Sequence, residues 1–373
     1  MPVLGAVLLA PSLPTISAAF ASTPGADVLA VLILTVPALM IALLASLAGV
    51  IADKIGRKRL LAGALLLYSV AGVAPVFLDS LLAILATRAV LGVAEAAIFT
   101  CCVALMSDYF FGRRRTRLIS LQSVVLGFSA TVFVFVGGIA GAASWRTPFW
   151  IYSIAIVIAL AVGLVAWRPA HEERSVSDSR PLEPLPLRPL LIPLGMTAFG
   201  GIVFYSIIVQ LAYLMGGLGE TSEAMIGLAS AVTQLISGAA SYSIRWLARF
   251  GVKRLLPTTF GISAVGLLMV WLAGSVPWLV VGAAITAAGA GVFLPTLLTW
   301  TLSSLAFHQR GRASGRWTSA VFLGQFASPL VVAGLGALVG ARPTAMGVLG
   351  IVTVIAVVAL WASLRRRQVA SLL

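Results

Sequence analysis

Long apolar runs separated by short polar links make up nearly the whole chain. The runs Val28–Ile51 and Leu60–Leu78 contain no Lys, Arg, Asp or Glu. A helix of roughly 20 apolar residues crosses a bilayer core about 30 Å thick, so each run is long enough to span a membrane. The same pattern predicts twelve spanning helices, at about residues 3–21, 28–52, 59–78, 80–106, 117–142, 147–167, 190–215, 222–247, 253–274, 277–304, 314–339 and 342–364. The sequence therefore predicts an all-α integral membrane protein.

Composition agrees with this pattern and narrows the chemistry. The 373 residues are 60% hydrophobic and 10% charged, with a mean hydropathy of +1.08, whereas a soluble domain carries about 25% charged residues. A net charge of +14 would suit a nucleic-acid partner, but the charges lie in short clusters between apolar runs. Cys101 and Cys102 are adjacent within a predicted span and are expected to pack as small residues, and His171 and His308 lie in links. We therefore expect no disulfide, metal site, cofactor or nucleic-acid partner.

The positions of the basic residues predict the topology. Twelve spans place both termini on the same side of the membrane, and 22 of the 25 Lys and Arg residues fall at that side. Arg146 and Arg342 fall at the other side, and Arg88 lies within a span. Short links rich in Lys and Arg stay in the cytoplasm. We therefore expect a multi-pass protein of the cell membrane (plasma or inner) with cytoplasmic N- and C-termini.

The longest polar stretch divides the chain into two parts. Residues 168–189 are rich in proline and mixed charges, which is typical of a flexible linker, between an N-terminal bundle at 1–167 and a C-terminal bundle at 190–373. The positive-inside rule alone would make basic links in the two parts similar in charge. Here the order of residues also matches between the two parts, at a constant offset of 195 residues. Secondary transporters are commonly built from such repeats. We therefore expect two pseudo-symmetric six-helix bundles. The matching sets are Gly56, Lys58, Arg59, Leu60 and Leu61 with Gly251, Lys253, Arg254, Leu255 and Leu256.

The same offset predicts that the first helix is shortened at its N-terminus. The seventh helix begins near Leu190, so its counterpart would begin before Met1. A cleaved signal peptide is the alternative, because residues 19–21 resemble a cleavage site. The absence of basic residues before the apolar core, and Pro11 and Pro14 within it, argue against that alternative.

A basic link between the second and third predicted spans carries a family motif. Its sequence, GVIADKIGRKRLL at residues 49–61, resembles the G-x-L-A-D-[RK]-x-G-R-[RK]-[RK] signature of the major facilitator superfamily of secondary transporters. The resemblance implies that Asp53 with Arg57 latches the two halves in the outward-facing state, and that Asp108 joins the same charge network. The glycines of the motif permit close packing and a tight turn. The residues that carry the motif are Gly49, Ile51 (in place of Leu), Ala52, Asp53, Lys54, Gly56, Arg57, Lys58 and Arg59.

Two ionisable residues lie well inside the fourth predicted span. Arg88 and Glu95 are seven residues apart, which places them on one helix face about 10.5 Å apart along the axis. Such residues cost at least ~2.5–3.5 kcal/mol each in mid-span and commonly mark function. Arg88, Gly92 and Ala96 also resemble the R-x-x-x-G-x-x-x-A motif that the superfamily associates with proton coupling. We hypothesise that Glu95 carries a proton under the influence of Arg88; the alternative is a static pair that holds the helices together.

A few polar side chains in the other spans are candidates for a substrate cavity. Substrate sites of such transporters lie near the membrane midplane between the two halves, and mostly apolar pockets use a small number of polar groups. Each of these side chains could instead hydrogen-bond to a neighbouring helix. The candidates are Gln122, Tyr205, Gln210, Gln234 and Gln325, with Tyr242 and Trp300.

These observations predict a monomeric transporter that exports small amphiphilic or drug-like compounds in exchange for protons. A proton-coupled importer of a sugar or organic acid is the alternative in the same fold. It stays open because FVGGIAG (residues 135–141) lacks the proline that drug–proton antiporters of the superfamily often carry in the fifth helix. A nontransporting receptor or scaffold would have no need of Arg88 and Glu95 at mid-depth. An intramembrane enzyme would need clustered catalytic groups, which the spans lack.

Overall fold

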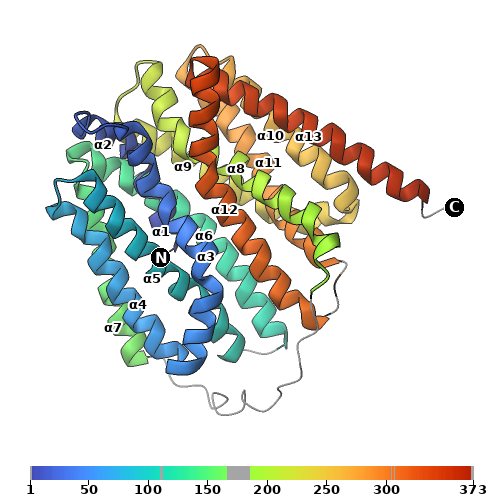
Figure 1. Ribbon diagram of the computed structural model, residues 1–373, viewed down its shortest axis with the longest axis horizontal. Helices are drawn as coiled ribbons and strands as arrows, with labels where there is room; N and C mark the ends of the chain where they lie inside the picture. Colours follow the sequence, from blue (N-terminus) through green and yellow to red (C-terminus); the bar gives the residue numbers. More distant parts are fainter. Residues whose placement is uncertain (1, 110–111, 166–184, 304, 306, 371–373) are drawn as a thin grey trace.

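The computed structural model describes residues 2–109, 112–165, 185–303, 305 and 307–370. Every regular element in these residues is helical, which confirms the predicted all-α class. Figure 1 shows the helices packed side by side along a common direction. The long helices are α3 (Ala26–Ile55), α4 (Arg57–Val73), α5 (Leu81–Tyr109), α6 (Gly112–Ala143), α7 (Ile154–Val165), α8 (Leu187–Gly217), α9 (Glu223–Leu247), α10 (Val252–Trp271), α11 (Val276–Ser303), α12 (Phe307–Val339) and α13 (Arg342–Ala370).

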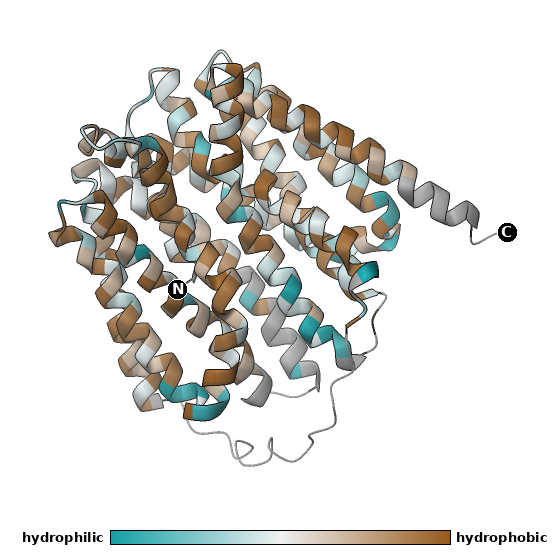
Figure 2. Ribbon diagram, viewed as in Figure 1, coloured by the Kyte–Doolittle hydropathy of each residue, from teal (hydrophilic) through white to brown (hydrophobic). Residues whose placement is uncertain are grey.

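Eleven helical segments in the described residues are long and apolar enough to cross a membrane. Their outer faces carry large apolar side chains, such as Leu164, Leu272 and Leu338, which are 85%, 74% and 83% exposed. Figure 2 shows hydrophobic residues along the lengths of the helices and hydrophilic ones near their lower ends. In a bilayer, these apolar faces contact lipid, which removes them from water.

The first predicted span is helical but broken into three pieces. These are α1 (Pro2–Val7), the 3₁₀ turn η1 (Ala10–Ser12) and α2 (Leu13–Ala19). Pro11 and Pro14 lie at the starts of the second and third pieces. Proline has no amide hydrogen and clashes with the preceding turn, which favours an interruption of the helix at these two positions. Shorter 3₁₀ segments also follow or precede other spans: η2 (Ala74–Phe77), η3 (Thr147–Ser153) and η4 (Ala248–Phe250).

Two large apolar cores and two small apolar clusters are present in the described residues. One large core is built from helices of the group α1 to α7, together with Tyr205 and Val209 of α8, and the other from α8 to α13. We call these two groups of helices the first half and the second half. The expected linker at 168–189 falls largely on residues 166–184, outside the described part of the chain, so the bundle boundaries at 1–167 and 190–373 stay predictions.

The two halves meet mainly along two helix pairs, α6 with α9 and α3 with α12, and η1 and α2 of the first span also pack on the second half. In the first pair, glycine faces glycine: a Cβ added to Gly138 would lie 2.7 Å from Gly227 Cα. Small residues let helices in membranes approach closely enough for their backbones to pack. In the second pair, Ser319 Oγ donates a hydrogen bond to Ala42 O at 2.8 Å.

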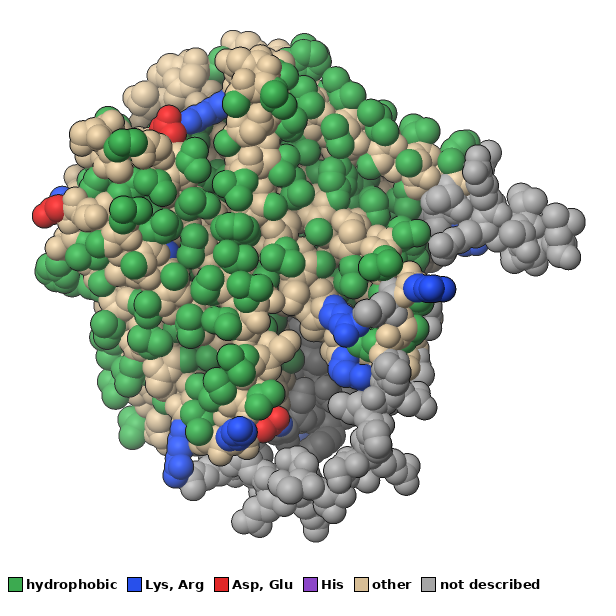
Figure 3. Space-filling model, in the orientation of Figure 1, with side chains coloured by type: hydrophobic (Ala, Val, Ile, Leu, Met, Phe, Trp, Pro, Cys, Tyr) green, Lys and Arg blue, Asp and Glu red, His purple; other side chains and the backbone are tan. Residues whose placement is uncertain are grey.

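The two ends of the molecule differ in charge. One end, which we call the basic end, carries the link between α3 and α4 and the link between α9 and α10, with their Lys and Arg residues. At the opposite end, Arg146 Nη2 lies 2.5 Å from Asp79 Oδ1 and Arg342 Nη2 lies 3.7 Å from Asp27 Oδ2. Figure 3, read with Figure 1, shows the molecule hollowed at the basic end, between the lower parts of α3 and α12. In the described part of the chain, α3 and α12 are thus separated at the basic end, and the halves are joined at the opposite end.

Candidate functional site

Glu95 of α5 lies in the interior of the first half. Its side chain is 1% exposed, and the Tyr68 side chain of α4 is hydrogen-bonded to its carboxyl group. A Cβ added to Gly5 of α1 would collide with Glu95 Oε1, so a side chain at this position would force the carboxyl group to shift. Glu95 Oε1 has no hydrogen-bond partner within the described part of the chain. The carboxyl group is therefore enclosed between α1, α4 and α5, with one oxygen unsatisfied.

Arg88 is equally buried, but it is directed at a different set of groups. Its Nη2 donates hydrogen bonds to Ala71 O at 2.8 Å and Gly72 O at 3.1 Å, at the end of α4. Its guanidinium carbon lies 5.2 Å from the ring centroid of Phe149 and 5.1 Å from that of Tyr152, within range of a cation–π interaction. No ion pair joins Arg88 to Glu95 among the described side chains.

The sequence explains why Arg88 binds these two carbonyl groups. Pro75 has no amide hydrogen, so it cannot donate to the carbonyl of Ala71, four residues earlier, or to that of Gly72, three residues earlier. An unsatisfied carbonyl inside a bilayer costs several kcal/mol. Arg88 supplies the missing donor from the neighbouring helix. This geometry gives Arg88 a structural role, in joining α5 to the end of α4, whatever it contributes to transport.

The residues of the family motif lie at the basic end. Arg57 Nη2 lies 3.1 Å from Asp53 Oδ1, and the Asp53 side chain is 64% exposed. Between them, Gly56 ends α3 and precedes α4 with φ of +91°, a conformation that favours glycine. Gly49 faces Thr100 across ordinary van der Waals space. The side chain of Asp108 is outside the described residues, so its part in this network stays a prediction, as does the latch formed by Asp53 and Arg57.

The polar candidates for a substrate cavity are not gathered in one place. Tyr205 OH of α8 donates to Leu34 O of α3 at 3.5 Å and so links the two halves. Gln234 and Gln325 are buried, and Gln122 is half-buried. Tyr242 is 51% exposed, with the Arg245 guanidinium carbon 3.6 Å from its ring centroid. Trp300 packs against the apolar core of the second half.

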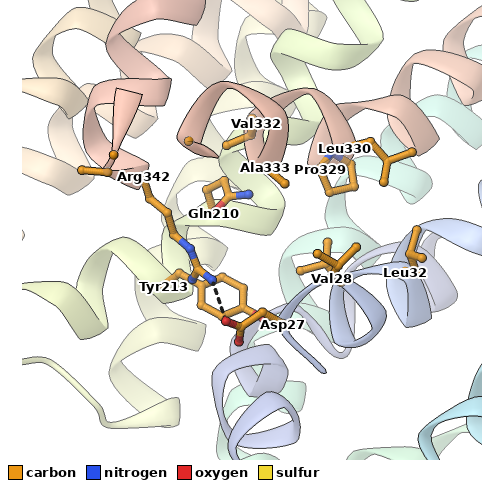
Figure 4. Close-up of a pocket in the computed structure, with 14 residues that line it drawn as sticks. Asp27, Val28, Leu32, Gln210, Tyr213, Pro329, Leu330, Val332, Ala333 and Arg342 are labelled. Atoms are coloured by element: carbon orange, nitrogen blue, oxygen red, sulfur yellow. Dashed lines mark ion pairs between the residues drawn. The ribbon is translucent and has the colours of Figure 1, made fainter. Parts of the chain in front are cut away.

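Gln210 is the candidate that lines a cavity between the halves. This cavity has a volume of about 240 Å³ and lies between α3, α8 and α12 near the opposite end. Gln210 is 5% exposed, and its Oε1 has no hydrogen-bond partner in the described structure. Figure 4 shows the amide among apolar side chains of α3 and α12, with the Asp27–Arg342 ion pair beside them. The Arg342 guanidinium carbon also lies 3.9 Å from the ring centroid of Tyr213.

Glu223 is a buried carboxylate that reasoning from the sequence did not single out. It is the first residue of α9 and is 7% exposed. Its two carboxylate oxygens accept hydrogen bonds from Ser12 Oγ and Thr15 Oγ1 of the first half. An acidic residue at the start of a helix is common because the helix dipole favours it, so Glu223 resembled an ordinary helix start. Its hydroxyl partners are more than 200 residues away in sequence, and no local pattern indicates them.

The sequence and the fold of this chain resemble those of known proteins. The family model described as Major Facilitator Superfamily matches residues 3–219 and 191–372. The tetracycline resistance protein, class C, of Escherichia coli is 26% identical over 319 residues, covering 80% of this chain and 78% of that protein. The class H protein of Pasteurella multocida is 25% identical over 350 residues, covering 88% and 85%. Among solved structures, a D-xylose–proton symporter superposes with a TM-score of 0.77 at 15% identity, over 96% of this chain and 94% of that one.

Proposed function

We propose that this chain, which belongs to the Major Facilitator Superfamily of transporters, exports small amphiphilic, drug-like compounds in exchange for protons. It is a multi-pass membrane protein whose substrate is a small molecule, and it is not an enzyme. In the proposed arrangement, the protein works as a monomer in the cell membrane, with the basic end and both termini in the cytoplasm. The conformation described here then has its hollow directed to the cytoplasm.

Glu95 is the observation that carries the proposal for proton coupling. Burying an unpaired charge is costly, and neither an ion pair with Arg88 nor solvent offsets that cost in this conformation. The neutral carboxyl group suits the enclosed position. To release its proton, Glu95 must become accessible to water, which requires α1 or α4 to move. A group that exchanges its proton only when the protein changes conformation meets the basic requirement of a proton-coupled transporter.

Export of amphiphiles is favoured over uptake of polar solutes. The chain resembles two tetracycline resistance proteins over most of its length. The described spans offer few polar side chains between the halves, and most residues that line the cavity beside Gln210 are apolar, with Asp27, Tyr213 and Arg342 as its other polar members. An apolar pocket with a few placed polar groups suits an amphiphilic ligand. A sugar would leave many of its hydroxyl groups without partners there.

Import of a sugar or organic acid is the second candidate. The fold likeness to the D-xylose–proton symporter and the absence of proline from residues 135–141 are compatible with it. An importer would accumulate its substrate on the cytoplasmic side when the outside is acidic, whereas an exporter of the proposed kind would move it the other way.

Transport into inverted membrane vesicles tests the proposal. The interior of the vesicles is acidified, and uptake of tetracycline and of D-xylose is followed with and without the pH gradient. We expect gradient-dependent uptake of tetracycline, its loss in Glu95→Gln, and normal uptake in the control Glu220→Gln, which removes a carboxylate from the loop at the opposite end. Gradient-dependent uptake by Glu95→Gln equal to that of the parent protein would refute the role of Glu95. Gradient-driven movement of D-xylose alone, in the opposite direction, would favour the importer.

A further inference from the structure

Among the described residues, most polar contacts between the two halves lie at the opposite end of the molecule; the bonds from Ser319 to Ala42 O and from Tyr205 to Leu34 O join the halves elsewhere. Glu223 of α9 binds Ser12 and Thr15 of the first span. Tyr213 OH of α8 donates to Leu13 O of α2 at 3.4 Å. Arg342 of α13 pairs with Asp27 of α3 (Figure 4). The first span takes part in most of these contacts, so it is the element through which the second half closes this end.

The Glu223 contact is the most enclosed of the three. Each of its carboxylate oxygens accepts a hydrogen bond from a different hydroxyl group, and the side chain is buried. A Cβ added to Gly141 of α6 would collide with Glu223 Oε2 and with Ser12 Oγ, so a glycine at this position leaves the space that the contact occupies. Hydrogen bonds to a charged group are among the stronger ones in proteins, and a buried carboxylate that loses them keeps its desolvation cost.

The Asp27–Arg342 pair is built differently. Its side chains are 69% and 40% exposed and its atoms lie 3.7 Å apart. Exposed ion pairs of this kind contribute little to stability. At the basic end, the Asp53–Arg57 pair lies within the first half and does not join the halves. Of these contacts, the Glu223 contact therefore contributes most to keeping the opposite end closed.

We propose that Glu223 is a positioning residue of the transport cycle that holds the opposite end closed through Ser12 and Thr15. In this mechanism, that end opens only when both hydrogen bonds break. The inference rests on the proposed transport function, because it assumes that the two ends open in alternation. It also connects the two buried carboxylates: the first span packs on Glu95 through Gly5 and binds Glu223 through its hydroxyl groups.

Distance measurements between spin labels test the proposal without relying on transport. After Cys101 and Cys102 are replaced by alanine, one label pair is placed at Ser22 and Thr221, in loops of the two halves at the opposite end. A second pair at Ile55 and Gly311 reports the basic end. In the double variant Ser12→Ala, Thr15→Val, the population with a longer distance at the opposite end should rise about tenfold or more. The distance at the basic end should shorten in that same population.

Two further variants make the result specific. Glu223→Gln should shift the populations in the same direction but less, because an amide can still bond to one or both hydroxyl groups. Thr87→Val is the matched control: Thr87 is a hydroxyl residue near the start of α5 that donates to Ile84 O within its own helix. Its removal should leave both distance distributions as they are in the parent protein.

The possible outcomes separate this inference from the proposed function. Distance distributions of the double variant and of Glu223→Gln that match those of Thr87→Val would overturn the role of Glu223. If the double variant does not fold, Glu223→Gln decides alone, and an unchanged distribution overturns the proposal in the same way. A parent protein that moves no probe compound would contradict the proposed function, while a shifted distance distribution would still support the Glu223 contact.

Discussion

Replacing Arg88 should destabilise the protein in a way that a second substitution, at Pro75, repairs. Arg88→Met removes the donor to Ala71 O and Gly72 O and leaves both buried carbonyl groups without that hydrogen bond. Each unsatisfied group costs about 1–3 kcal/mol, and the lost cation–π contacts add roughly 0.5–2 kcal/mol. The arginine's own desolvation cost offsets part of this loss. We expect a net destabilisation of about 2–4 kcal/mol.

Pro75→Ala restores a backbone amide hydrogen at the position from which a regular helix would donate to Ala71 O. In the double variant Arg88→Met, Pro75→Ala, the carbonyl has a partner again, so the two substitutions should not be additive. We expect an interaction energy of about 1–3 kcal/mol in a double-mutant cycle. The assay is equilibrium unfolding in mixed lipid–detergent micelles, followed by helical circular dichroism.

Arg245 provides the control, because its guanidinium packs on Tyr242 and Trp246 of α9, in the other half of the molecule from Arg88 and Pro75. Combining Arg245→Met with Pro75→Ala should give additive effects within about 0.5 kcal/mol. An interaction energy near zero for Arg88 and Pro75 would refute the argument that Arg88 replaces the missing amide. A double variant that regains stability but not transport would show that Arg88 also has a role in proton coupling.

Two further predictions follow from the same interior and from the basic end. Gly5→Ala should lower the free energy of unfolding by ~1–3 kcal/mol and abolish proton-driven uptake, because its Cβ would collide with the Glu95 carboxyl group. Gly63→Ala is the control in the same unfolding and vesicle assays, since a Cβ at that position meets nothing within 4 Å. Equal behaviour of the two glycine variants would contradict the packing of α1 on Glu95. Asp53→Asn should change stability by less than about 1 kcal/mol, since its pair with Arg57 is exposed, yet slow uptake severalfold. Uptake at the parent rate would remove Asp53 from the transport cycle.

The long spans could be predicted closely because apolar length is a local property of the sequence. The helix expected at 222–247 is α9, Glu223–Leu247. The first predicted span is helical where the sequence places it, but its division into α1, η1 and α2 depends on how Pro11 and Pro14 are accommodated by neighbouring helices. The two prolines in the sequence indicate that the helix is interrupted, but the packing of the neighbouring helices determines where each piece ends.

The side-chain partners were harder to predict, because they depend on which helices become neighbours. The spacing of Arg88 and Glu95 fixes their helix face, but a long arginine side chain can reach sideways to the end of α4. The shortage of donors created by Pro75 becomes a signal only once α4 and α5 are known to be adjacent. The contact of Glu223 with Ser12 and Thr15 could likewise be predicted only once α9 and the first span are known to be adjacent. Gln210 could be proposed from its polarity alone, whereas Tyr242, chosen on the same ground, is on an exposed face.

The closure at the opposite end depends on the order in which the chain is made. Ser12, Thr15 and Asp27 are synthesised first, Glu223 arrives with α9, and Arg342 arrives only with the last helix. Because domains of a nascent chain fold from the N-terminus, the buried contact can form while several helices are still missing, and the exposed ion pair is added at the end. In a chain that is stalled far enough beyond α9 for this helix to have left the ribosome, Glu223 should therefore already bind Ser12 and Thr15. Truncation of α13 would remove the Asp27–Arg342 ion pair and leave the Glu223 contact intact.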